Sequence, residues 1–266
     1  MKRLNTWILG SLLVIAGQVS AENIYVLSSG DSTTDNAVVS TLQAYGHTVT
    51  LGVQYTAFDG SQSLAGFDVV YLQANANWAA GDMPASGQTA LLNFINNGGG
   101  LVTCEWVIWK TAAVGHFAIL RAAFPVVPTT SYNGNATATY EQVTADSILN
   151  AGLPTSFSFP LDDYGGGSET NIGSAQQGAT VFYNSTVGTP HLGVVGWNYG
   201  GGRVLMFSTT NGPSQLSDAN FGRLFSNAMR WAAAGGCSLE GDVNGDGVVD
   251  DADLLIVLFN FGNRCP

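Results

Sequence analysis

Short apolar strands alternate with helices from residue 22 onward, and this alternation is the strongest constraint on the fold. Apolar residues at helical spacing mark the helices, and glycines end two of them, at Gly46 and in the run 96–100. The predicted strands are 23–28, 47–53, 67–72 and 101–106, and the helices between and after them are 34–45, 88–95 and 107–124. Such an alternation predicts an α/β protein with a mainly parallel sheet that is covered on both faces.

The second half of the chain differs from the first in composition. Residues 126–185 are rich in Thr, Ser and Gly and predict peripheral strands and long loops over one edge of the sheet. Two strands at 191–197 and 203–208, joined by a Gly-rich turn, predict an antiparallel hairpin. An amphipathic helix is predicted at 220–234, where Phe221 belongs to the apolar face, and small residues then lead to Cys237.

Five segments carry a resemblance to a known superfamily: AYGHTVT, LAGFDVVYLQ, LLNFINNGGGLV, YGGGRVLMFS and FGRLFSNAMRWAAAG. They resemble, in order, segments of the class I glutamine-amidotransferase-like superfamily, and within it of the ThuA-like branch. The resemblance implies a flavodoxin-like three-layer sandwich over residues 22–235. It also implies a carbohydrate-related role, because that branch is associated with sugar utilisation, although its members differ in function.

The first 21 residues read as a signal peptide, so the protein is expected to be secreted. Lys2 and Arg3 precede an apolar stretch, and the segment 19–21 (Val-Ser-Ala) has the small-x-small pattern of a cleavage site. No later apolar run approaches the length of a membrane span. Cleavage leaves six basic and nineteen acidic residues, a net charge of −13. This charge argues against nucleic acids and anionic membranes as partners and is compatible with neutral glycans or divalent cations.

In such a sheet, ligands bind at the carboxyl ends of the strands. A carboxylate at the end of an apolar strand needs a partner or a chemical role, so Glu105 is the leading catalytic candidate, although a structural hydrogen bond would also explain it. Trp106 offers a stacking face for a sugar ring. Asp31 and Asn77 follow other strands and are predicted to contact the substrate.

Two nucleophiles compete with that assignment. Cys104 falls where the superfamily has its nucleophile, but the late histidine, His191, has no acid two residues on, and strand alternation would separate Cys104 from Glu105. Ser32 lies in a segment that resembles the first block of GDSL-type esterases, whose activating histidine falls within a late Asp-x-x-His; residues 217–221 of this chain have no histidine, and none follows His191. Glutamine hydrolysis is therefore not expected, and an esterase using Ser32 is an alternative function.

The segment 242–253 has the spacing of a calcium-binding EF-hand loop. Oxygen donors fall at loop positions one, three, five, nine and twelve, a glycine takes position six, and position seven offers a backbone carbonyl. The predicted Ca²⁺ ligands are Asp242, Asn244, Asp246, Val248 (through its carbonyl), Asp250 and Asp253. Four carboxylates within twelve residues would repel one another without a divalent cation.

The loop and the apolar helix that follows resemble a dockerin repeat, present once. The resemblance implies that residues 236–266 attach the protein to a cohesin-like or cell-surface protein, although the pair Asp251-Ala252 departs from the usual recognition residues. Cys237 and Cys265 bracket this module and are expected to form a disulfide in an oxidising compartment. The sequence thus predicts a secreted, carbohydrate-related enzyme or, alternatively, a non-catalytic glycan- or surface-binding protein on the same fold.

Overall fold

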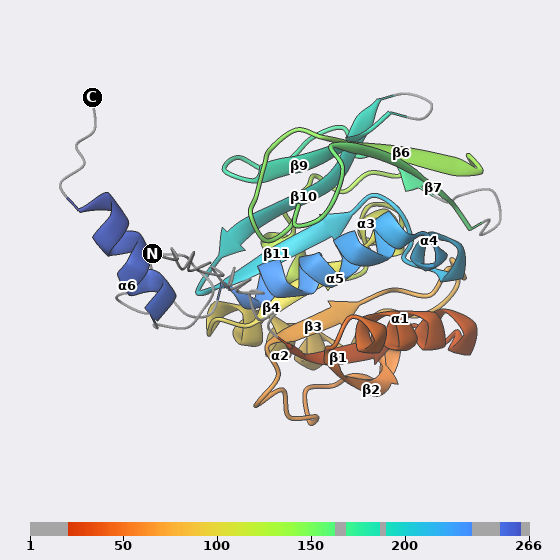
Figure 1. The fold of residues 1–266 in the computed structure, drawn as a ribbon. Coiled ribbons are helices and arrows are strands. Elements are labelled where there is room, and N and C mark those ends of the chain that lie inside the picture. Colours follow the sequence, from red (N-terminus) through yellow and green to blue (C-terminus); the bar gives the residue numbers. More distant parts are fainter. Residues whose placement is uncertain (1–20, 163–168, 187–189, 236–250, 262–266) are drawn as a thin grey trace, which may run out of the picture.

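The computed structural model describes residues 21–162, 169–186, 190–235 and 251–261. Its centre is a nine-stranded mixed sheet in the order β2-β1-β3-β4-β11-β10-β9-β6-β7, with helices on both faces (Figure 1). The predicted α/β sandwich of the flavodoxin type is confirmed. Within the described residues, no helix combines the length and apolar character that a membrane span requires.

The first five strands of that order form the parallel half of the sheet. They are β2 (Thr48–Gln54), β1 (Asn23–Ser28), β3 (Val69–Leu72), β4 (Gly100–Thr103) and β11 (Gly202–Phe207). Every residue of β3 and β4 is buried, because helices cover both faces of these central strands. Their carboxyl ends meet at one edge of the sheet.

The remaining strands are antiparallel to their neighbours. They are β10 (His191–Tyr199), β9 (Thr180–Ser185), β6 (Thr137–Gln142) and β7 (Ser156–Pro160). The predicted hairpin is therefore present as β10–β11, and the predicted peripheral strands extend the sheet beyond it. A separate two-stranded ribbon pairs β5 (Tyr132–Asn133) with β8 (Glu169–Thr170).

Two hydrophobic cores fill the space between the sheet and the helices. One core takes side chains from α1 (Ser32–Ala44), α4 (Pro213–Ser217) and α5 (Ala219–Ala233). The other takes side chains from α2 (Ala85–Asn96), α3 (Glu105–Ala113) and the 3-10 helices η1 (Tyr55–Ala57) and η2 (Leu120–Ala123). A last helix, α6 (Asp251–Asn260), follows the predicted calcium loop.

The predicted boundaries that change the interpretation of the site lie in the segment after β4, and they were wrong. The strand ends at Thr103 instead of residue 106, because Cys104 caps α3 and Glu105 begins that helix. The helix predicted over 107–124 stops at Ala113, since Gly115 and Phe117 both have positive φ (72° and 55°) and interrupt helical geometry. The alternation argument that separated Cys104 from Glu105 consequently does not apply, and both side chains are buried.

A buried histidine links the edge of the parallel half to α5. His47 accepts a hydrogen bond from the Glu22 backbone N–H at Nδ1 (3.2 Å), and its Nε2 lies 2.9 Å from the Ser226 hydroxyl. Burial, followed by the nearby Arg230 guanidinium, lowers the pKa of His47 from 6.5 to about 4. The neutral imidazole is thus part of the folded structure.

We expect acid to destabilise the protein through His47. Between pH 6.5 and 4 the His47 side chain binds a proton in the unfolded chain but not in the folded chain. The contribution of neutral His47 to the free energy of unfolding is therefore fully present above pH 6.5 and is lost as the pH falls toward 4. The full loss is about 3 kcal/mol. Denaturant unfolding at pH 7.5, 5.5 and 4 measures it. His47→Gln should remove much of this pH dependence, and His116→Gln should not; equal profiles for both variants would contradict the assignment.

Candidate functional site

Four consecutive polar residues are completely buried where β11 ends. Ser208, Thr209, Thr210 and Asn211 each have no exposed surface. They run past the start of α3, where the Glu105 backbone N–H donates to the Thr209 carbonyl (3.3 Å). Polar side chains this deep require partners. The segment 208–211 therefore marks the carboxyl ends of β4 and β11 as a polar site inside an apolar fold.

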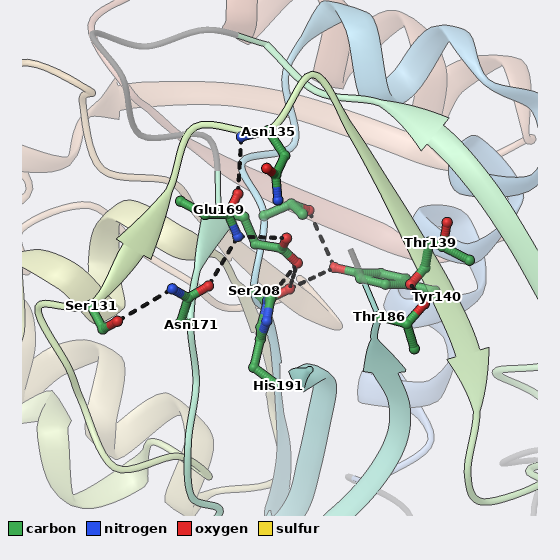
Figure 2. A network of polar contacts seen from close by, with 11 residues as sticks. Ser131, Asn135, Thr139, Tyr140, Glu169, Asn171, Thr186, His191 and Ser208 are labelled. Atoms are coloured by element: carbon green, nitrogen blue, oxygen red, sulfur yellow. Dashed lines mark hydrogen bonds and ion pairs between the residues drawn. The ribbon is translucent and has the colours of Figure 1, made fainter. Parts of the chain in front are cut away.

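Glu169 is the centre of this site (Figure 2). It comes from β8 and is held beside the end of β11 by a bridge to Thr209. Its Oε1 lies 2.9 Å from His191 Nε2 and accepts a hydrogen bond from the Ser208 hydroxyl (2.7 Å). Its Oε2 accepts from the Asn133 amide (3.2 Å). The side chains of His191 and Glu169 are 3% and 0% exposed, so the contact is shielded from bulk water.

The network continues in two directions from Glu169. Inward, the Tyr140 hydroxyl lies 3.1 Å from the Ser208 hydroxyl. Because Ser208 gives its one proton to Glu169, Tyr140 is the donor in that contact. Outward, Asn133 donates to Asn171 Oδ1 (2.9 Å), and Asn171 donates to the hydroxyl of the exposed Ser131 (3.3 Å). A chain of amides and hydroxyls thus leads from the surface to the buried carboxylate.

Glu105 adds a second carboxyl group to the same site. It is 2% exposed at the start of α3. Burial raises the pKa of Glu105 well above its ordinary value, and the charge of Glu169 raises it further. Its Oε2 is fully buried and has no hydrogen-bond partner in the described part of the chain. Glu105 therefore keeps its proton to a higher pH than an ordinary glutamate.

The arrangement is suited to acid–base chemistry. Glu105, whose pKa is raised by burial, lies near a second carboxyl group that contacts an imidazole, and neighbouring groups of this kind can supply an acid and a base to one site. The described residues contain no group of three His, Cys, Asp or Glu side chains that could hold a metal ion. The chemistry available to these side chains is proton transfer and hydrogen bonding.

The other predicted substrate contacts have local roles in the structure. Asp31 is the N-cap of α1, and its side chain accepts from the backbone N–H groups of Thr33 (2.8 Å) and Thr34 (3.3 Å). Ser32, the esterase candidate, is the exposed first residue of the same helix. Neither residue belongs to the network around Glu169, although both lie at the same edge of the sheet.

Asn77 lies in the loop after β3, next to the buried Lys110. The Lys110 ammonium donates to the carbonyls of Asn77 (2.8 Å) and Ala80 (3.3 Å). The Asn77 side chain accepts from the Ala79 backbone N–H (3.0 Å) and stabilises the loop. Trp106 follows Glu105 on α3, is partly exposed and packs edge-on against Trp109. Of the three predicted substrate contacts Asp31, Asn77 and Trp106, Trp106 alone adjoins Glu105 in the chain.

Cys104 caps α3 and is completely buried. Burial raises the pKa of its thiol to about 12. Its sulfur lies 3.8 Å from the Tyr71 hydroxyl. Because a thiolate is the reactive form, this environment disfavours the nucleophilic role that the sequence suggested. His191, the late histidine considered for that role, contacts Glu169 instead.

Glu169 was missed by sequence reasoning. It lies in a stretch rich in glycine and serine, 22 residues before His191, and only the pairing of β8 with β5 and the end of β11 brings it to the site. The run of polar residues at 208–211, directly after an apolar strand, was a signal that could have located the site. The sequence could not show that this run is buried.

Most of the predicted calcium ligands lie outside the described residues, namely Asp242, Asn244, Asp246, Val248 and Asp250, as do Cys237 and Cys265. Asp253 is described. It lies in the first turn of α6 and is 2% exposed, whereas Leu254 and Leu258 on the same helix are 57% and 58% exposed. A buried carboxylate at the start of the helix fits the last ligand position of an EF-hand loop.

An open groove of about 560 Å³ lies at the opposite edge of the sheet, near the amino ends of β3 and β4. Its lining includes Leu64, Phe67, Asp68 and Phe94. The Asp68 carboxylate is already bound by the backbone and side-chain amides of Asn23 (2.7 and 3.2 Å). The groove thus lacks the acid–base groups that gather around Glu169.

Comparison with known proteins bears on the fold. No family model matches the sequence, and no curated protein sequence does. A protein described as ThuA-like from Bacteroides uniformis superposes with a TM-score of 0.60 at 13% identity, over 82% of this chain and 94% of its own. Another, from Parabacteroides merdae, gives a TM-score of 0.56 at 14% identity, over 83% and 93%. The fold is that of ThuA-like proteins.

This result confirms the predicted class I glutamine-amidotransferase-like architecture. A β-galactosidase from Rahnella sp. R3 also matches, with a TM-score of 0.53 at 13% identity, over 79% of this chain but 31% of the galactosidase. At these identities the likeness concerns the fold alone. The chemistry of this domain has to be inferred from its own side chains.

Proposed function

We propose that this chain is a secreted enzyme that acts on a neutral carbohydrate, with its reactive centre at Glu105, Glu169 and His191. In this proposal Glu105 is the proton donor, and Glu169 with His191 accepts a proton from water or from a substrate hydroxyl. The observation that carries the proposal is the unpartnered, fully buried Oε2 of Glu105 beside a second carboxylate. An arrangement this costly to stability is typical of functional sites.

The chemistry of the surrounding groups favours an uncharged substrate. Glu169 is contacted by a hydroxyl, an amide and an imidazole, and the path to the surface passes through Asn133, Asn171 and Ser131. Amides and hydroxyls both donate and accept hydrogen bonds, as sugar hydroxyls do. The strongly acidic mature sequence would also repel anionic substrates.

Glutamine variants of the two carboxyl groups test the proposal. Glu105→Gln and Glu169→Gln keep the side-chain shape but remove the acid or the base, so each should lower kcat/KM by about 100-fold or more. The measurement is hydrolysis of a panel of neutral oligosaccharides by the wild type and the variants. Glu141→Gln, which alters an exposed glutamate on β6, is the matched control and should leave the rate unchanged.

The buried Cys104 thiol, whose raised pKa disfavours a nucleophilic role, favours one alternative, a non-catalytic glycan-binding domain on the same fold. It predicts sugar binding without turnover, measured by calorimetry on the same panel. Sugar binding that persists in Glu105→Gln, together with no product formation by the wild type, would show that the glycan-binding function is correct and the enzymatic one is wrong. Neither binding nor turnover of any sugar would refute both.

We further propose that residues 236–266 attach the protein, through a Ca²⁺-loaded loop, to a cohesin-like or cell-surface protein. The EF-hand spacing of residues 242–253 and the buried Asp253 support this role. The ion, when bound, would be held by the six predicted ligands and would order the start of α6. The exposed apolar side chains of that helix, among them Phe259 and Phe261 (81% and 85% exposed), offer a contact surface for the partner.

Removing two loop carboxylates should abolish tight calcium binding. Asp242→Ala together with Asp246→Ala deletes the ligands at loop positions one and five, and the remaining oxygens are too few for a stable site. We expect at least about a 100-fold weaker Kd, measured by calorimetry on the full chain. Asp59→Ala and Asp218→Ala together serve as a control outside the loop. A double loop variant that binds Ca²⁺ as tightly as the wild type would refute the assignment.

A further inference from the structure

Asn211 is the residue of the buried segment 208–211 that no internal contact accounts for. Ser208 donates to Glu169 and accepts from Tyr140. The Thr209 hydroxyl lies 3.3 Å from the Tyr140 hydroxyl, and the Thr210 hydroxyl accepts from the Gln215 amide (2.9 Å). The amide oxygen and nitrogen of Asn211, in contrast, are both fully buried with no hydrogen-bond partner in the described part of the chain.

The surroundings of Asn211 connect it to Glu105. The Glu105 carboxyl group lies near the Thr210 backbone N–H, so Glu105 and Asn211 adjoin the same residue. On the other side, the Asn211 side chain lies close to the Tyr71 hydroxyl. Tyr71 donates its proton to Gln73 Oε1 (2.5 Å), so it has no proton to give to the carboxamide oxygen of Asn211. A carboxyl group and a carboxamide, each with buried polar atoms that have no hydrogen-bond partner of ordinary geometry in the described part of the chain, therefore lie at the ends of β4 and β11.

Burying an amide without hydrogen bonds lowers the stability of a protein, and few native groups are left in this state. A group that costs stability and has no internal partner is commonly completed by a ligand or an ordered water. A carboxamide presents one acceptor and two donor hydrogens side by side. Two adjacent hydroxyl groups match it, since one donates to Oδ1 while the other accepts from Nδ2.

We infer that Asn211 binds two neighbouring hydroxyl groups of the carbohydrate and thereby selects a sugar with a free vicinal diol. This inference rests on the proposed function, because it concerns the same site. Glu105 then lies beside the bound ring and Asn211 fixes its orientation. Asn211 is a binding residue in this scheme, so its loss should affect substrate affinity more than the proton-transfer step.

Asn211→Leu is the decisive variant, and Asn227→Leu is its matched control. Asn227 is also buried, but its amide donates to the carbonyls of Leu149 (3.1 Å) and Ala151 (3.0 Å). Without sugar, Asn211→Leu should unfold at the same temperature as the wild type or higher, because an unpaired amide is replaced by an apolar group of similar size. Asn227→Leu should unfold at a lower temperature.

Sugar binding is measured by calorimetry with lactose, cellobiose and maltose, on the full chain. For the sugars that the wild type binds, we expect Asn211→Leu and Asn211→Ala to weaken the Kd at least about 10-fold, and Asn227→Leu to leave it unchanged. Unchanged affinity in both Asn211 variants would overturn the inference and leave the proposed function intact. Failure of the wild type to bind any of these sugars, together with no turnover on the wider panel, would overturn the proposed function and this inference with it.

Discussion

Replacing Glu169 with alanine is expected to lower the free energy of unfolding by about 3–5 kcal/mol. The carboxylate contacts three elements of the site: it accepts hydrogen bonds from Ser208 at the end of β11 and Asn133 of β5, and it lies 2.9 Å from His191 Nε2 of β10. Alanine removes this acceptor. The groups that donated to it then have no hydrogen-bond partner, because water has little access to the site. The ribbon β5–β8 and the edge of β11 should then separate.

Denaturant unfolding at neutral pH measures this loss. Glu169→Gln keeps an acceptor oxygen and should cost less than alanine, whereas Glu141→Ala, at an exposed position, should change the free energy by less than about 0.5 kcal/mol. A Glu169→Ala protein as stable as the wild type would show that the carboxylate does not hold the site together. It would also weaken the case that His191 is oriented by Glu169.

The two buried glutamates of the site differ in their effect on stability. Glu105 is buried with an unpartnered oxygen and a raised pKa, so the folded state is penalised as the pH rises and the group tends to ionise. A purely structural residue would not be retained in that state, whereas functional residues commonly reduce stability. Glu169 differs from Glu105, because both of its carboxylate oxygens have a partner.

Local sequence signals were sufficient for the parallel half of the sheet. Apolar runs such as that of β3, glycine stops such as Gly46 and the helical spacing in α5 are each contained in a short segment, and burial on both faces leaves little choice of arrangement. The errors came after β4, where Cys104 ends the strand as a helix cap and positive φ values at Gly115 and Phe117 end α3. These depend on tertiary contacts that no local pattern records.

The site was harder to predict for a related reason. Glu105 was found because it was predicted at the carboxyl end of a central strand, and the rule for strand ends applies there. Glu169 comes from a two-residue strand, which is too short to have a recognisable pattern, and its partners His191 and Ser208 are 22 and 39 residues away. Asp31 and Asn77 met the same rule as Glu105 but serve as a helix cap and a loop contact.

Replacing Phe221 with alanine is the second change with a large expected effect, about 3–5 kcal/mol of unfolding free energy. Phe221 lies in the first turn of α5 and is completely buried. Its ring packs against Phe159 (4.5 Å between centroids), Phe207 (5.7 Å) and Tyr140 (6.3 Å), so one side chain joins α5 to β7, β11 and β6. Truncation would leave a cavity among aromatic rings that cannot easily collapse.

The loss at Phe221 should also reach the site, because Tyr140 carries the hydroxyl that donates to Ser208, which in turn donates to Glu169. Denaturant unfolding measures the stability, and sugar turnover at a temperature where the variant is folded measures the site. Phe221→Leu should cost less, since most of the volume stays filled, and Phe261→Ala, at an 85% exposed position, should cost almost nothing. If Phe221→Ala loses stability while its turnover matches the wild type, the aromatic core supports the sheet without positioning Tyr140, and the orientation of Glu169 then depends on Ser208, Asn133 and His191.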